Sequence, residues 1–280
     1  WVIGIIQPQI YRTSFLLIAL VLTFVVFPAH PRWRSRVMWI DWSLASLAII
    51  SLAWPIIDFD RFVYRAATPS SIDLILGSVV IILTLEATRR TVGPILPVTA
   101  IAFLLYGYFG PLLELVGLNI FAHRGYDEAR LIGTLYMTLE GIFGVPLNVA
   151  STFIVLFTIF GSVLAHSGAG KFFIDWTMAA FGRSQSGAGP GRTVTLSGFL
   201  LGTVSGSGVA TTVTLGAVAW PLLRRAGFTP EVGGAILSAS GIGAIMAPPT
   251  MGAAAFLIAE FLQITYLQVI IMAIIPAVLY

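Results

Sequence analysis

The feature that most constrains this chain is an uncharged stretch between two basic ends. Residues 193–223 carry no charge over 31 residues, with Arg192 before them and Arg224 and Arg225 after them. At a helical rise of about 1.5 Å per residue, this stretch is longer than one crossing of a hydrocarbon core of about 30 Å but too short for two. The sequence SGSG at 205–208 divides it, and Ser and Gly leave helical geometry readily. We therefore predict a re-entrant hairpin at about 193–223, made of two half-length helices.

The composition places this hairpin in an integral membrane protein. Hydrophobic residues make up 58% of the 280 residues, charged residues make up 10%, and the mean hydropathy is +0.95, which excludes an ordinary soluble domain. Apolar runs of helical length predict an all-α polytopic fold. The net charge of +3 comes from arginines between apolar runs, so we expect membrane lipid and no nucleic acid as a partner. The absence of cysteine excludes thiolate metal sites and cysteine nucleophiles.

Four apolar runs precede the hairpin region. They predict transmembrane helices around residues 15–27, 37–57, 72–85 and 92–113. The third run is followed by Glu86, Arg89 and Arg90, which we expect to form an ion-pair cluster on the surface. A polar break at 119–130 precedes a region rich in Gly and Ser, so we place a domain boundary near residue 118. Beyond it, residues 131–139 predict a helix along the membrane surface, residues 147–165 a span, and residues 263–280 the start of another.

A second interrupted element follows the hairpin. Residues 229–231 (TPE) provide an N-cap, a proline at the first helical position and an acid in the first turn. We expect this helix to end at about Ser240, because residues 241–243 (GIG) and 248–249 (PP) disfavour a helix near the middle of the bilayer. A second half then runs from about Met251 to Glu260. Residues 230–261 are thus predicted to form a broken helix.

The two interruptions predict one shared binding pocket, because unwound backbone inside a membrane must be buried in protein or line a wet cavity. A helix that ends there offers free carbonyls, which suit a small cation, and the next helix offers free N–H groups, which suit an anion. No carboxylate lies within either break, which favours Na⁺ over a proton relay. The expected Na⁺ ligands, largely backbone carbonyls, are Ser205, Gly206, Ser238, Ser240 and Gly241. The expected contacts of a substrate carboxylate are Ser207, Gly208, Thr211, Thr212 and Thr250.

Three other interpretations of these residues stay open. Gly and Ser in membrane helices often serve close packing, and the spacing of Gly202 and Gly206 fits that role. A membrane channel can also build its filter from re-entrant loops. An intramembrane serine hydrolase with Ser205 or Ser207 as nucleophile would need a nearby base, yet no His or Lys lies after residue 171. We therefore expect that the chain is not an enzyme.

Five segments carry a resemblance to a known family. They are residues 86–93 (EATRRTVG), 140–146 (EGIFGVP), 160–164 (FGSVL), 205–210 (SGSGVA) and 247–260 (APPTMGAAAFLIAE). They resemble the membrane component of TRAP transporters, the tripartite ATP-independent periplasmic class, and most closely its TAXI-type fused form. The resemblance implies that residues 1–118 are a small-subunit-like four-helix region and that residues 119–280 are the first of two inverted repeats of the large transport subunit.

The same resemblance implies a function. It implies an elevator-type secondary transporter in the inner membrane that imports an organic acid, coupled to Na⁺ or H⁺, with a periplasmic substrate-binding protein that delivers the acid. The cations at both ends of the hairpin predict that both of its feet face the cytoplasm. Because the chain begins at Trp1 and ends at Tyr280 inside an apolar run, we expect it to be part of a longer protein that holds the second repeat.

Overall fold

The computed structural model describes residues 7–29, 39–115, 117–181 and 189–280. Every regular element in this part of the chain is a helix, which confirms the predicted all-α fold. Among the described residues, four helical segments are long and apolar enough to cross a membrane, namely Pro8–Val26, Trp39–Ile57, Ser71–Thr91 and Val145–Val163. The run at 92–113, predicted as a span, forms a shorter apolar helix of 15 residues, Ile95–Phe109. The chain divides into two compact units, Trp1–Asn148 and Val149–Tyr280. The boundary near residue 118 rests on a change in composition and stays a prediction.

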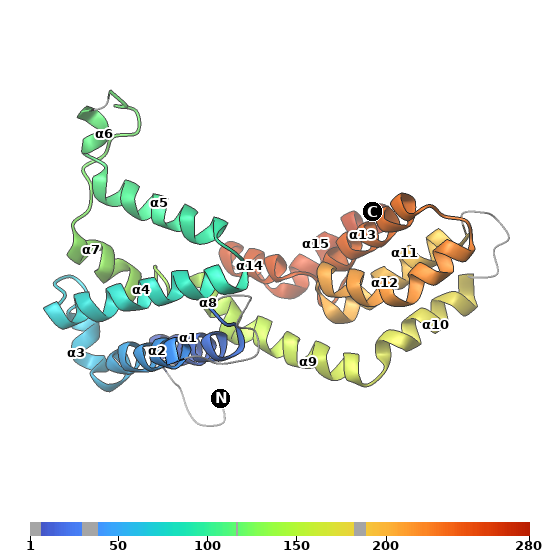
Figure 1. The fold of residues 1–280 in the computed structure, drawn as a ribbon, viewed down its shortest axis with the longest axis horizontal. Coiled ribbons are helices and arrows are strands. Elements are labelled where there is room, and N and C mark those ends of the chain that lie inside the picture. The colour runs from blue at the N-terminus through green and yellow to red at the C-terminus, as the bar shows by residue number, and fades with distance from the viewer. Residues whose placement is uncertain (1–6, 30–38, 116, 182–188) are drawn as a thin grey trace. The chain divides into compact units, whose positions relative to one another are not determined.

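The first unit is built around α1 (Pro8–Val26), α2 (Trp39–Ile57) and α4 (Ser71–Thr91), which pack against one another (Figure 1). Its other elements are α3 (Phe59–Tyr64), α5 (Ile95–Phe109), α6 (Leu112–Leu115), α7 (Glu128–Ile132) and the π-helix η2 (Gly133–Met137). α1 begins earlier than predicted, at Pro8, because a proline at the first helical position is already set for the helix. The segment 131–139, predicted as a surface helix, forms the end of α7 and η2 as far as Met137, and Tyr136 and Met137 are buried in the core of this unit.

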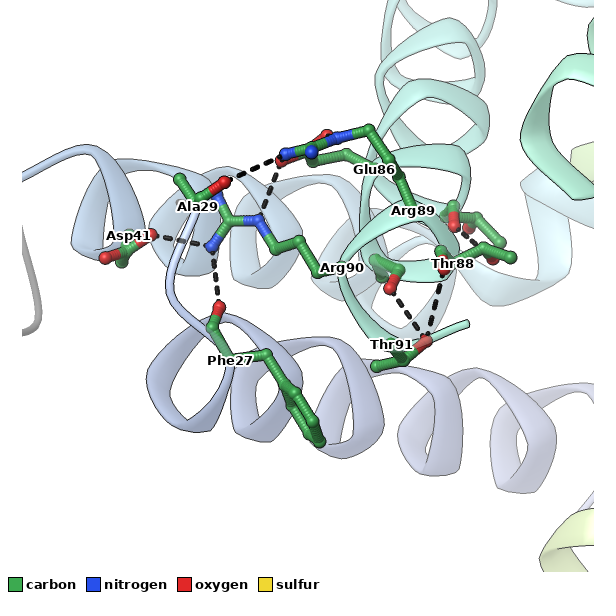
Figure 2. Close-up of polar contacts among 10 residues, drawn as sticks. Phe27, Ala29, Asp41, Glu86, Thr88, Arg89, Arg90 and Thr91 are labelled. Atoms are coloured by element: carbon green, nitrogen blue, oxygen red, sulfur yellow. Dashed lines mark hydrogen bonds and ion pairs between the residues drawn. The ribbon is translucent and has the colours of Figure 1, made fainter. Parts of the chain in front are cut away.

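A buried ion-pair cluster joins the ends of α1, α2 and α4 (Figure 2). Arg90 Nη1 lies 2.6 Å from Asp41 Oδ1 and donates to the carbonyl oxygen of Phe27 at 3.0 Å, while Arg90 Nε lies 2.7 Å from Glu86 Oε1. The side chain of Arg90 is only 1% exposed and that of Asp41 only 2%. The predicted surface cluster is therefore wrong for Arg90, because tertiary packing brings Asp41 and Phe27 onto it. Arg89, at 45% exposed, does pair with Glu86 at the surface.

The second unit contains the elements of both predicted breaks. They are η3 (Ala150–Ile154), α9 (Val155–His166), α10 (Ala169–Phe181), α11 (Gly189–Ser205), α12 (Gly208–Arg225), α13 (Pro230–Met246), α14 (Ala253–Leu262) and α15 (Tyr266–Leu279), and α8 (Val145–Val149) lies at the junction of the units. α11, α12 and α13 lie side by side (Figure 1). Thr229 caps α13 through a hydrogen bond from the N–H of Val232, and Pro230 is its first residue, as predicted.

Small residues let α11, α12 and α13 approach closely. A Cβ placed on Gly198 would lie 2.5 Å from Cβ of Ser240, and one placed on Gly202 would overlap the backbone of Ala244. Neither position has room for a side chain larger than hydrogen. Close helix packing therefore accounts for these two glycines, in agreement with the packing interpretation of the Gly-rich sequence.

Candidate functional site

The predicted hairpin consists of α11 and α12. α11 ends at Ser205, Gly206 has a φ of +58°, Ser207 is the extended N-cap, and α12 begins at Gly208. Gly206 lets the chain reverse here, because the left-handed region is open to glycine at little cost. Helices of 17 and 18 residues are each about 26 Å long, which is close to a hydrocarbon core of about 30 Å, so the predicted half length of these helices is wrong. The interruption predicted at 205–208 is confirmed.

The two feet of the hairpin lie at its same end. A Cβ placed on Gly191, early in α11, would lie 3.5 Å from Cζ of Phe228, which follows the last residue of α12, Arg225, by three positions. The start of α11 and the end of α12 are therefore close, and Arg192 and Arg225 both lie remote from the tip. The face of the membrane that they occupy stays a prediction.

The broken helix consists of α13 and α14, with residues 247–252 as the linker between them. The predicted end at Ser240 is wrong, because α13 continues through Gly241 to Met246. Gly241 does not end the helix but makes room for the hairpin, since a Cβ on it would overlap Oγ1 of Thr212. The helix ends where the two prolines at 248 and 249 supply no backbone N–H.

The two interruptions meet at a cavity of about 430 Å³, which we call the tip cavity. Its lining includes residues 204–209 of the hairpin tip, residues 250–253 of the linker and first turn of α14, and two aromatic side chains, Phe157 of α9 and Phe256 of α14. None of the lining residues is acidic or basic. The tip cavity is therefore a neutral site at which two helices end and two others begin.

The structure brings half of the ten predicted site residues to this cavity. Those that line it are Ser205, Gly206, Ser207, Gly208 and Thr250. Those outside its lining are Thr211, Thr212, Ser238, Ser240 and Gly241. The reason for the last three is the later end of α13. The carbonyls left free at a helix end belong to its last four residues, here 243–246, whereas residues 238–241 lie further inside α13.

Hydroxyl groups around the cavity bond mainly to the protein itself. Thr250 Oγ1 lies 3.0 Å from the carbonyl oxygen of Gly202 and 2.9 Å from that of Thr203, so its single proton is shared between them. This contact ties the last turn of α11 to the linker. Ser205 Oγ lies 2.6 Å from Thr211 Oγ1. Because the neighbour of Ser205 is another hydroxyl and not a base, the hydrolase interpretation gains no support.

Backbone N–H groups are the donors that the cavity has to offer. In α12, Ala210 N donates to Ser207 Oγ, and the N–H groups of Gly208 and Val209 have no partner among the described residues. In α14, the same holds for the N–H groups of Ala253 and Ala254. The first N–H groups of a helix and its dipole favour an anion. Two helix N-termini at one cavity therefore form a site that suits a carboxylate.

Aromatic side chains that the sequence analysis did not single out form one side of the site. The ring of Phe256 stacks on that of Tyr266 with centroids 4.4 Å apart, and its centroid lies 5.0 Å from that of Phe157. Tyr266 Oη lies 2.8 Å from the carbonyl oxygen of Pro249. The sequence could have drawn attention to Tyr266, because this residue has a hydroxyl group and directly follows a helix-capping residue, Thr265, at the start of an apolar helix.

Comparisons with known proteins agree with the resemblance to the membrane component of TRAP transporters. The family model described as "Tripartite ATP-independent periplasmic transporter, DctM component" matches residues 79–280. The chain is 32% identical over 98 residues to the C4-dicarboxylate TRAP transporter large permease protein DctM of Rhodobacter capsulatus, which covers 35% of this chain and 22% of the relative. It is 24% identical over 155 residues to a Haemophilus influenzae protein provisionally named a TRAP transporter large permease protein. That match covers 55% of this chain and 35% of the relative. The matched part spans roughly a fifth to a third of these relatives. No solved structure matches the chain.

Proposed function

The chain belongs to the DctM component family of tripartite ATP-independent periplasmic transporters, and from this we propose that it is part of a permease that imports an organic acid together with Na⁺. Its apolar helices and its family make it a multi-pass membrane protein. The name of the Rhodobacter capsulatus relative makes a C4-dicarboxylate the first substrate to test. The resemblance to the TAXI-type fused form supports residues 1–118 as a small-subunit-like region and residues 119–280 as the first repeat of the transport subunit. The family model of the large component begins at residue 79, within the first of these two regions.

The observation that carries this proposal is the neutral tip cavity at the meeting point of two interrupted elements. The N–H groups at the starts of α12 and α14 suit a substrate carboxylate, while carbonyl and hydroxyl oxygens suit a dehydrated cation. Na⁺ is preferred to H⁺ as the coupling ion because no carboxylate lies in the cavity lining to carry a proton. Each Na⁺ that binds with the substrate offsets one negative charge of its carboxylates in a site without charged side chains.

The proposed cycle moves this site across the inner membrane as an elevator. A periplasmic binding protein delivers the organic acid, the hairpin closes over it, and the unit that holds the tip cavity moves inward with Na⁺. The hairpin feet at Arg192 and Arg225 face the cytoplasm in this scheme. The second repeat of the large subunit would supply the opposing half of the site.

The test is uptake by the whole permease in liposomes. Purified binding protein and radiolabelled succinate, as a C4-dicarboxylate probe, are added outside under an inward Na⁺ gradient, with choline replacing Na⁺ in the control. We expect uptake only with both Na⁺ and the binding protein. Equal uptake in choline would contradict Na⁺ coupling, and flux without the binding protein would indicate a channel.

A pair of variants locates the site within the same assay. Ser207→Leu places an isobutyl group in the tip cavity, whereas Thr214→Leu adds the same group to an exposed position of α12. We expect Ser207→Leu to abolish uptake while expression stays normal, and Thr214→Leu to transport like the wild type. Normal uptake by Ser207→Leu would place the site elsewhere.

A further inference from the structure

The linker between α13 and α14 has more carbonyl groups than internal donors. Pro248 and Pro249 have no backbone N–H. The N–H of Met251 donates to the carbonyl oxygen of Ala247 at 3.2 Å, and the N–H of Gly252 donates to that of Ile245 at 2.8 Å. The carbonyl oxygens of residues 249 and 250 therefore need a donor from outside the linker.

Tyr266 supplies that donor from α15. Its Oη lies 2.8 Å from the carbonyl oxygen of Pro249 and 3.0 Å from that of Thr250, so one phenolic proton serves both. The side chain is held from two directions. Its ring stacks on Phe256 at 4.4 Å with an interplanar angle of 10°, and a capping box formed by Thr265 and Gln268 fixes the start of α15.

The linker that Tyr266 holds has a strained backbone. Met251 has a φ of +42°, in the left-handed region, which is unfavourable for a residue with a side chain. Such a conformation persists only where its surroundings fix it. It also reaches the hairpin directly, because a Cβ on Gly206 would lie 2.5 Å from the carbonyl oxygen of Met251. The shape of the linker therefore decides how the linker and the hairpin tip meet at the tip cavity.

We propose that Tyr266 is a positioning residue, whose hydroxyl holds the carbonyls of Pro249 and Thr250 and so fixes the linker in the shape that binds the coupling ion. This inference rests on the proposed function for the identity of the ion. The hydrogen bonds from Tyr266 to the linker carbonyls do not depend on the proposed function. Phe256, which lines the tip cavity, connects the ring of Tyr266 to the site.

The test compares Tyr266→Phe with Tyr280→Phe in the whole purified permease. Tyr280 is a matched control because its hydroxyl also donates to a backbone carbonyl, at 2.8 Å, but that carbonyl belongs to Ala239 in α13 and not to the linker. Hydrogen–deuterium exchange is measured at residues 250–254. In parallel, the melting temperature is measured as a function of NaCl concentration, with choline chloride at the same ionic strength as the reference.

We expect Tyr266→Phe alone to speed exchange at residues 250–254 and to raise the half-saturating Na⁺ concentration about fivefold, the effect of one typical hydrogen bond. Unchanged exchange, an unchanged half-saturating concentration, or equal changes in Tyr280→Phe would overturn the proposal. If Na⁺ fails to stabilise even the wild type, Na⁺ coupling in the proposed function is wrong. Hydrogen–deuterium exchange at residues 250–254 then still tests whether Tyr266 holds the linker.

Discussion

Gly206 is the residue at which the chain reverses direction in the hairpin, and we predict the effect of replacing it. Gly206→Ala would force an alanine into a φ of +58° with its Cβ 2.5 Å from the carbonyl oxygen of Met251. We expect the free energy of unfolding to fall by about 1–2 kcal/mol or more, and succinate uptake to be lost. Thermal melting in detergent and the liposome assay measure the two effects.

The control for Gly206 is Gly234, in the interior of α13, where an added Cβ meets nothing within 4 Å. Gly234→Ala should stabilise the protein by about 0.5–1 kcal/mol, because alanine is the better helix former. A Gly206→Ala protein as stable and as active as Gly234→Ala would show that the tip does not depend on a left-handed glycine.

Arg90 makes the second prediction at this scale. Arg90→Met removes the guanidinium that pairs with Asp41 and Glu86, and loss of one partner of a buried pair typically costs about 3–5 kcal/mol. Arg89→Met breaks an exposed pair with the same Glu86, which should cost only about 0–1 kcal/mol. Melting temperatures of the two variants test this order. Equal shifts would mean that the Arg90 cluster is not a structural centre of the first unit.

What the sequence could predict about these residues depended on how far apart their partners are. Glu86, Arg89 and Arg90 are three and four positions apart on one helix, so their pairing was readable. Asp41 is 49 positions from Arg90, and no local pattern relates the two. The burial of Arg90 follows from that tertiary contact, which the neighbouring sequence does not indicate.

At the scale of the elements, the contact between α11 and α13 predicts a strong effect of one methyl group. A Cβ on Gly202 would overlap the backbone of Ala244, so Gly202→Ala must push the helices apart. Overpacking of this kind costs about 1–3 kcal/mol, and uptake should fall because the carbonyl of Gly202 also accepts from Thr250. In the control Gly216→Ala, the new Cβ lies an ordinary 3.7 Å from Cδ1 of Leu237. Equal melting temperatures for the two variants would refute the close packing.

The hairpin was predictable because length and charge determine it, and both are visible in one stretch of sequence. The end of α13 at Met246 could not be predicted in this way. Glycine in a helix interior costs only about 1 kcal/mol, and the packing of Gly241 against the hairpin outweighs that preference. The same error explains why three of the ten predicted site residues, Ser238, Ser240 and Gly241, lie outside the cavity lining. The prolines at 248 and 249 indicated the end of α13 correctly, because proline has no backbone N–H to donate to a helical hydrogen bond.

At the scale of the whole molecule, the sequence predicted an all-α membrane protein and its family correctly, because composition and long motifs carry both. The direction of the hairpin in the membrane is the next prediction. This chain has no cysteine, so Arg192→Cys and Ala226→Cys each introduce one thiol at an exposed foot. A membrane-impermeant maleimide should label both from the cytoplasmic side only. Labelling from opposite sides would exclude a re-entrant hairpin.

The central claim is that the hairpin tip and the linker of the broken helix form one binding site for a carboxylate and Na⁺. An experimental structure of the whole permease, determined with bound C4-dicarboxylate in NaCl, tests it most directly. We predict carboxylate density at the starts of α12 and α14, in contact with the N–H groups of Gly208 and Ala253. Carboxylate density at another site, with the tip cavity holding no ligand, would contradict the account.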